Sequence, residues 1–140
     1  TMLENVPATP LGDMFREHIR LLLAKDIEGL LDQYSPTAIL MSSIEKVPKI
    51  FRGREELREH FQGILAIEDL VDHVGFWGEF NGAETGHADG LTGLMITEGI
   101  EMTVGGQKMG MRFADSWVLR NGLIEIHFAG MVQFPDGSLS

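Results

Sequence analysis

The chain has 140 residues, of which 44% are apolar, so it is long enough to bury one hydrophobic core, and we expect a single domain spanning residues 1–140. Its 21 acidic and 11 basic residues give a formal net charge of -10, which argues against a nucleic-acid partner or an anionic membrane surface because both would repel it. The absence of cysteine excludes disulfides and thiolate metal sites, and no apolar run approaches the roughly 20 residues that span a bilayer, so we expect a soluble, cytoplasmic protein.

Three helices are predicted in the first half of the chain. The first begins with Thr9 as its cap and Pro10 at the first helical position, and it runs to about Lys25. His18 falls in the middle of its apolar stripe, which consists of Leu11, Met14, Phe15 and Leu22. The second helix is capped by Asp26, and its periodicity turns the following side chains inward: Ile27, Leu30, Leu31 and Tyr34.

The third helix starts at Gly53 and is predicted to bury Leu57, Phe61, Ile64 and Leu65. Between the second and third helices, Ser35-Pro36 precedes an apolar run at residues 38–41, which we interpret as a strand followed by a loop of about a dozen residues. After Asp69 the pattern alternates with period two, which predicts strands near residues 71–80, 90–103, 108–120 and 123–133. Asn81-Gly82 and Asn121-Gly122 mark tight turns, so the sequence predicts an α+β fold in which helices close one face of a curved antiparallel sheet.

One carboxylate stands out in the predicted strand 108–120. Asp115 alternates in phase with an apolar face that consists of Met109, Met111, Phe113, Trp117 and Leu119. An ionised carboxylate on such a face is costly, so Asp115 must be partnered, or neutral with a raised pKa. It either hydrogen-bonds a backbone or helix group and helps to hold the fold, or it lines a pocket.

The stretch from Asp26 to Ile67 carries a resemblance to a known family. Asp26-Ile27-Glu28-Gly29 opens a short helix, a strand and a long loop follow, and Gly53-Arg54-Glu55 opens another helix. This order is similar to that of the nuclear transport factor 2-like superfamily, in particular its ketosteroid isomerases and SnoaL-like polyketide cyclases. The resemblance implies a cone-shaped barrel around an apolar pocket, and a homodimer formed through the outer face of the sheet.

The resemblance also assigns positions within the pocket. The ketosteroid isomerases form an oxyanion hole from a tyrosine of the first helix and a protonated aspartic acid of a late strand. Those positions correspond to His18 and Asp115. Their general base corresponds to Ser42, whose hydroxyl is a poor base, and a second tyrosine corresponds to Phe61, whereas Tyr34 matches a third. A steroid isomerase of the usual mechanism is therefore not expected.

The other histidines leave alternatives open. His73 lies near the catalytic histidine position of related dehydratases, but alternation puts it opposite its apolar neighbours, so it could face either side. A two-residue turn at Asn121-Gly122 places Ile124, Ile126 and Phe128 on the face of Asp115 and His127 on the opposite face, whereas a three-residue turn would reverse this. His60 and His87 are interpreted as solvated surface residues.

We therefore expect a cofactor-independent enzyme that moves protons on a hydrophobic, cyclic or polyketide-like substrate, by isomerisation, cyclisation or dehydration. Asp115 would act with His18 or His73, Tyr34 would orient them, and other side chains would line the pocket: Ser42, Phe61, Met111, Phe113, Trp117 and Phe128. No histidine spacing suggests a metal site and no glycine-rich phosphate loop is present, so no metal or nucleotide is expected. The alternatives are a non-catalytic ligand-binding or association module, since fold alone does not settle function, and an epoxide hydrolase.

Overall fold

The computed structural model describes residues 6–43, 47–66, 68–81, 91–104 and 106–133, with backbone only for residues 68–81, 95–104, 108–109, 111–113 and 131–133. Three helices lie in its first half: α1 (Pro10–Leu23), α2 (Ile27–Leu31) and α3 (Gly53–Ile64). Two strands separate α2 from α3, namely β1 (Tyr34–Ser42) and β2 (Lys49–Arg52). Four long strands follow: β3 (Glu68–Asn81), β4 (Leu91–Val104), β5 (Gln107–Arg120) and β6 (Leu123–Gln133).

The predicted helix caps are confirmed. The Thr9 side chain accepts a hydrogen bond from the Gly12 amide, and the Asp26 side chain accepts one from the Gly29 amide. Each cap satisfies one of the amides that the first turn of a helix leaves without an intrahelical partner. The two helices consequently begin within one residue of their predicted starts, and α1 ends two residues before Lys25.

One six-stranded sheet forms the body of the fold, in the order β2-β1-β6-β5-β4-β3. The predicted α+β fold and the antiparallel meander of β3 to β6 are confirmed. In addition β1 pairs with β6 in parallel, which the sequence did not indicate, so the whole sheet is mixed. The sheet does not close, since it ends at β2 and β3. Strand β2 was also missed, because its four residues are largely exposed at the sheet edge and carry no alternating pattern.

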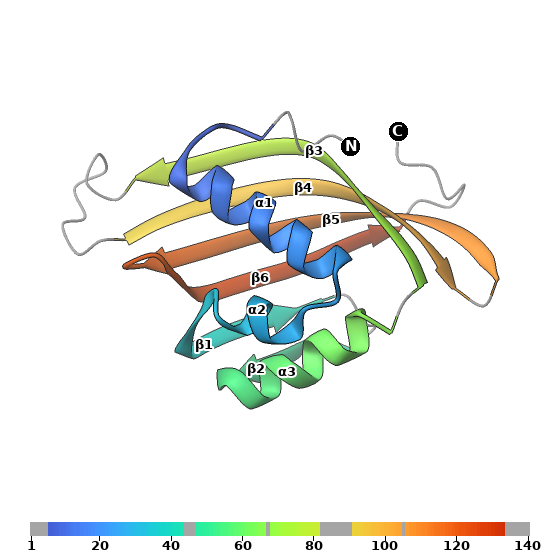
Figure 1. Cartoon of the computed structure of the whole chain (residues 1–140), viewed down its shortest axis with the longest axis horizontal. Coiled ribbons are helices and arrows are strands. Elements are labelled where there is room, and N and C mark those ends of the chain that lie inside the picture. Colours follow the sequence, from blue (N-terminus) through green and yellow to red (C-terminus); the bar gives the residue numbers. More distant parts are fainter. Residues whose placement is uncertain (1–5, 44–46, 67, 82–90, 105, 134–140) are drawn as a thin grey trace.

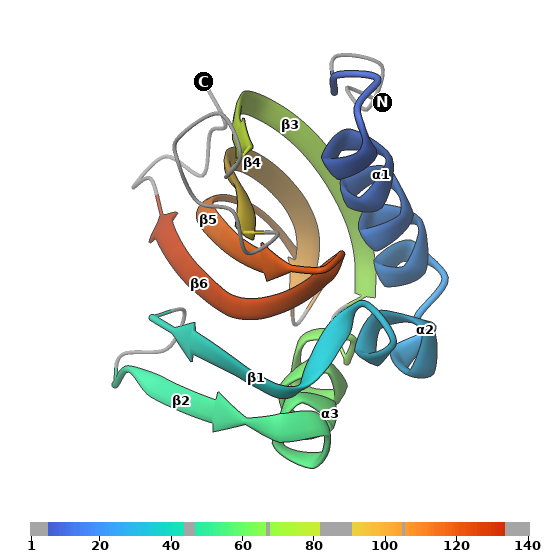
Figure 2. The same cartoon turned by 90° about the vertical axis from the view of Figure 1, so that its left-hand side faces the viewer.

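The helices cover one face of the sheet. Helix α1 crosses the long strands and α3 lies beside β1 and β2 (Figure 1), and the strongly bent strands curl around the side away from α1 (Figure 2). The core between the layers is built from fully buried side chains of both, among them Phe15, Ile19, Leu30, Leu40, Leu57 and Trp117. In the part of the chain that the structure describes, no helix has the length and apolarity that a membrane crossing requires.

Candidate active site

A chain of three hydrogen-bonded side chains lies in the core, between the helices and the sheet. The Tyr34 hydroxyl lies 2.8 Å from His127 Nδ1, and His127 Nε2 lies 3.0 Å from Asp115 Oδ1. All three residues are buried, with 5% of His127 and 6% of Asp115 exposed. The carboxylate that sequence reasoning placed on an apolar face is thus partnered, as its burial requires, and its partner is an imidazole.

Electrostatics favour one direction of donation along this chain. Burial, and then the nearby Asp115 charge, holds the pKa of the Tyr34 phenol well above its usual value, so the phenol keeps its proton. In a neutral His127 the phenol can donate to Nδ1, and the Nε2 proton is then donated to the Asp115 carboxylate. Every polar atom in these two contacts has a complementary partner in that arrangement.

A second histidine, His18, lies beside this chain as the stripe of α1 predicts. Its ring centroid is 4.7 Å from that of Trp117, 6.3 Å from that of Phe61 and 6.5 Å from that of His127. Burial, and then the neighbouring His127, lowers the pKa of His18 to about 4, against the opposing effects of a Gln33 hydrogen bond and of Asp115. His18 is therefore neutral at pH 7.

The expected pairing of His18 with Asp115 is not what the structure shows. His18 Nδ1 lies 2.9 Å from Gln33 Oε1, and Gln33 Nε2 donates to the Met14 carbonyl oxygen at 3.0 Å. No hydrogen bond joins His18 to Asp115 within the described residues. Sequence reasoning did not single out Gln33, because it follows α2 in a turn where no periodicity indicates which way a side chain points.

The orientation of His127 depends on an irregularity in β6. The turn at Asn121 and Gly122 has two residues, both with positive φ, as predicted. However, Leu119 pairs with Ile124 and Val118 pairs with Ile126, so one extra residue, Glu125, bulges out of β6. The bulge reverses the alternation beyond it, which turns His127 inward opposite Trp117 and places Phe128 on the outer face.

Three sequence predictions are corrected here. His127, which the two-residue turn assigned to the outer face, is in the core, and Phe128, expected in the pocket, is 47% exposed. His60, expected at the surface, is buried, with its ring centroid 4.9 Å from that of Phe51 and 5.1 Å from that of Phe61. The first two errors share one cause, the bulge at Glu125, and the third arises because β2 supplies Phe51 as a cover.

The remaining predicted site residues divide into two groups. Tyr34, Phe61 and Trp117 lie in the core around His18 and His127, and Ser42 is buried on the inward side of β1. Trp117 Nε1 is buried without a hydrogen-bond partner among the described residues. The side chains of His73, Met111 and Phe113, and the whole of His87, lie outside the described residues, so their assignments stay predictions.

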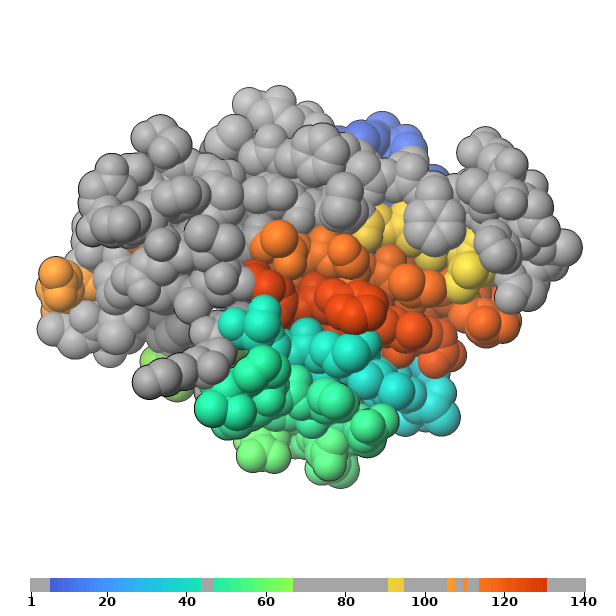
Figure 3. Space-filling model, turned by 180° about the vertical axis from the view of Figure 1, so that it is seen from behind, coloured from blue at the N-terminus to red at the C-terminus, as the bar shows by residue number. Residues whose placement is uncertain are grey.

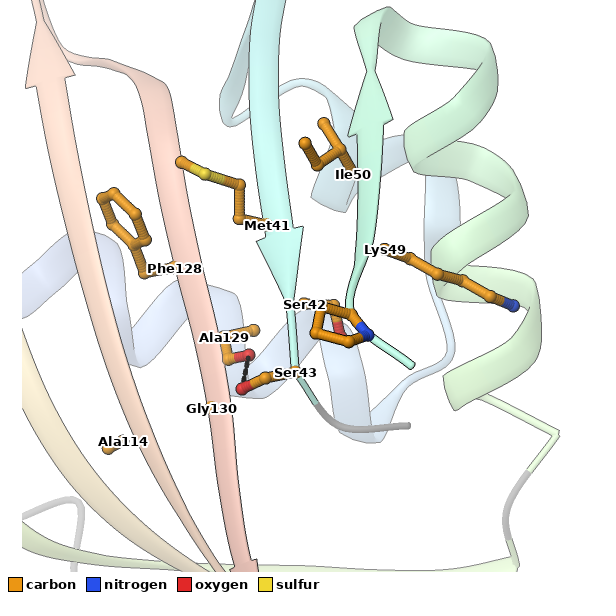
Figure 4. Close-up of a pocket in the computed structure, with 10 residues that line it drawn as sticks. Met41, Ser42, Ser43, Lys49, Ile50, Ala114, Phe128, Ala129 and Gly130 are labelled. Carbon is orange, nitrogen blue, oxygen red and sulfur yellow. Dashed lines mark hydrogen bonds between the residues drawn. The ribbon is translucent and has the colours of Figure 1, made fainter. Parts of the chain in front are cut away.

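The opposite face of the sheet carries an open hollow of about 380 Å³. Parts of β1, β5 and β6 lie bare at the middle of this face (Figure 3), and Met41, Ile50 and Phe128 project from adjacent strands beside the hollow (Figure 4). Ser43 donates to the Ala129 carbonyl oxygen at its floor. With Ile50 53% exposed and Phe128 47% exposed, the surface is largely apolar. Ser42, Ser43 and Lys49 also line it, but Tyr34, His127 and Asp115 do not.

Comparisons with proteins of known structure place this arrangement in a fold group. A proposed association domain of a calcium/calmodulin-dependent protein kinase II from Xanthomonas campestris superposes with a TM-score of 0.72, at 15% identity over 90% of this chain and 86% of its own. A ketosteroid isomerase-like protein from Erwinia carotovora superposes with a TM-score of 0.65, at 12% identity over 84% of this chain and 90% of its own. A proposed polyketide cyclase from Sinorhizobium meliloti superposes with a TM-score of 0.63, at 11% identity over 92% of this chain and 99% of its own.

The chain has the nuclear transport factor 2-like fold. No family model matches the sequence, and no curated protein matches it either. At these identities the nuclear transport factor 2-like fold is what the neighbours share with this chain, and their activities do not transfer with it. Within the residues that the structure describes, no three His, Asp or Glu side chains are grouped as a metal site.

Proposed function

We propose that the protein is a cofactor-independent enzyme that transfers protons on a hydrophobic small molecule next to a carbonyl or hydroxyl group. The observation that carries this proposal is the buried chain Tyr34–His127–Asp115 with the neutral His18 beside it. Burying an acid, a phenol and two imidazoles together is costly, and four such groups are more than a core needs for its stability. Isomerisation, cyclisation and dehydration all require such a set of proton donors and acceptors.

The hydrogen-bond chain can release its phenol to a substrate. When His127 takes up a proton, both ring nitrogens become donors, so Nε2 still bonds the Asp115 carboxylate and Nδ1 now donates to the Tyr34 oxygen. The Tyr34 hydrogen is then available to an oxygen of the substrate on which negative charge develops. Asp115 acts through His127 in this scheme, by stabilising the imidazolium.

His18 supplies the proton acceptor. A buried imidazole with a pKa of about 4 has the basicity of an ordinary carboxylate and is unprotonated at neutral pH. It thereby offers the function that Ser42 cannot provide at the position where the isomerases have their base. His73, on β3, stays the alternative to His18 as the proton acceptor, as the sequence suggested.

The surroundings favour an apolar, ring-shaped substrate. The rings of Phe61 and Trp117 flank His18, with centroids 6.3 and 4.7 Å from that of its ring, and the Trp117 centroid is also 5.7 Å from that of His127. Aromatic walls bind flat apolar molecules through area and edge-to-face contacts. Similarity to a ketosteroid isomerase-like protein and to a proposed polyketide cyclase supports the same substrate class.

Calorimetric binding of planar phenols of increasing acidity tests the proposal. Phenolates resemble the enolate that proton abstraction would form, so wild-type affinity should rise with acidity. Tyr34→Phe removes the donor with little change of shape and should lower affinity for the most acidic phenol roughly 100-fold. Phe128→Ala, on the outer face, is the control and should bind as wild type does. Affinity that is indifferent to acidity and to Tyr34→Phe would refute the proposal and favour a container for apolar ligands.

A second candidate function is association between protein chains, and it rests on the apolar outer face of the sheet. Met41, Ile50 and Phe128 form an exposed apolar patch around the hollow, and one structural neighbour is a proposed association domain. We place the expected homodimer on this face. Light scattering should give the mass of two chains for the wild type and of one chain for Phe128→Asp, while a wild-type mass of one chain would contradict it.

A further inference from the structure

We infer that Gln33 is a positioning residue that fixes the tautomer of His18, so that His18 presents Nε2 to the site as an unprotonated acceptor. The inference deepens the proposed function and rests on it for its catalytic meaning. The tautomer itself is a property of the resting protein and can be measured without a substrate.

The geometry at Gln33 leaves one assignment of donors and acceptors. A backbone carbonyl can only accept, so the Gln33 group that lies 3.0 Å from the Met14 oxygen must be the amide NH₂. The other end of the amide is then its carbonyl oxygen Oε1, which can only accept, and it lies 2.9 Å from His18 Nδ1. His18 Nδ1 must therefore carry the proton.

The state of the imidazole completes the argument. A neutral imidazole holds one ring proton, so a proton on Nδ1 leaves the lone pair of Nε2 bare. Within the part of the chain that the structure describes, no residue hydrogen-bonds Nε2, so no described contact occupies this lone pair. The two histidines thus differ: both ring nitrogens of His127 are engaged, by Tyr34 and Asp115, whereas His18 keeps one nitrogen for chemistry.

Gln33 is itself held in place from three sides. Its backbone N–H donates to the Leu30 backbone carbonyl oxygen at 3.0 Å, and its backbone carbonyl oxygen accepts from the Ile124 backbone N–H at 2.9 Å. With the side-chain bond to Met14, these contacts tie it to α2, β6 and α1 at once. It also borders a surface hollow with Met14 and Leu123, so a change of side chain there should be accommodated without disrupting the core.

The test is nitrogen NMR of the histidine rings at pH 7 in wild type, Gln33→Glu and Gln33→Leu, with His18→Gln to assign the signals. Nitrogen shifts distinguish a protonated from a bare ring nitrogen. We expect Nδ1–H for His18 in wild type and in Gln33→Glu, whose carboxylate still accepts from Nδ1. In Gln33→Leu we expect Nε2–H to become populated. Asp32→Asn, at an exposed neighbour on the same hollow, is the control and should leave the shifts unchanged.

A wild-type Nε2–H tautomer, or the same tautomer in wild type and Gln33→Leu, would overturn the inference. Circular dichroism and urea midpoints of the variants show whether each is folded. If Gln33→Leu is unfolded, the ring shifts of wild type and Gln33→Glu provide the test. The proposed function fails separately, through phenol affinities that ignore acidity and Tyr34→Phe. Those affinities do not involve the ring shifts of His18, so the two failures are distinguishable.

Discussion

Acidification should destabilise the protein through His18, and the size of the effect follows from its burial. The pKa of His18 is lowered from 6.5 in an unfolded chain to about 4 in the fold. Above pH 6.5 both states carry a neutral ring and the fold has its full stability. Between pH 6.5 and 4 the unfolded chain binds a proton that the folded chain does not. The free energy of unfolding therefore decreases as the pH is lowered through this range.

The loss should total about 3 kcal/mol, at about 1.4 kcal/mol for each pKa unit of difference. For a domain of this size such a loss is a large fraction of the stability. His18→Gln cannot charge, so it should lack this component. The variant also loses ring packing against Trp117, but that cost is the same at every pH and cancels when slopes are compared.

Urea denaturation between pH 4 and pH 8, at fixed protein concentration, measures the effect. The difference in unfolding free energy between wild type and His18→Gln should shrink by about 3 kcal/mol from pH 7 to pH 4. His127, Asp115 and His60 also act on His18 electrostatically and are present in both proteins, so the comparison removes most of their own contribution. Parallel curves, within about 0.5 kcal/mol, would refute a buried neutral His18.

Two further predictions concern how the site is held. Tyr34→Phe leaves His127 Nδ1 without its partner in the core and should cost about 1–3 kcal/mol in urea denaturation; a change of only a few tenths would contradict the hydrogen bond. Deleting Glu125 removes the bulge, so it should either turn His127 outward or force β6 to shift register, and lower the melting temperature far more than Glu125→Ala does. Equal melting temperatures for the two variants would show that the bulge does not set the register.

Much of the framework was predictable because its signals are local. Thr9 and Asp26 precede apolar periodic segments, and each caps its helix as predicted. The period of α1 placed His18 in the core, and the alternation of β5 placed Asp115 and Trp117 there. In each case the face of a residue follows from the geometry of its own helix or strand, which does not depend on the rest of the chain.

Tertiary structure decided which of these groups meet. The extra residue at Glu125 has no local signature, yet it moves His127 from the outer face to Asp115. The parallel pairing of β1 with β6 brings Tyr34 to His127 across 93 positions of sequence. Gln33 reaches His18 because α1, the turn after α2 and β6 pack together. Side-chain partners of this kind depend on register and on the packing of distant elements, so the sequence determined the candidates and only the fold selected the pairs.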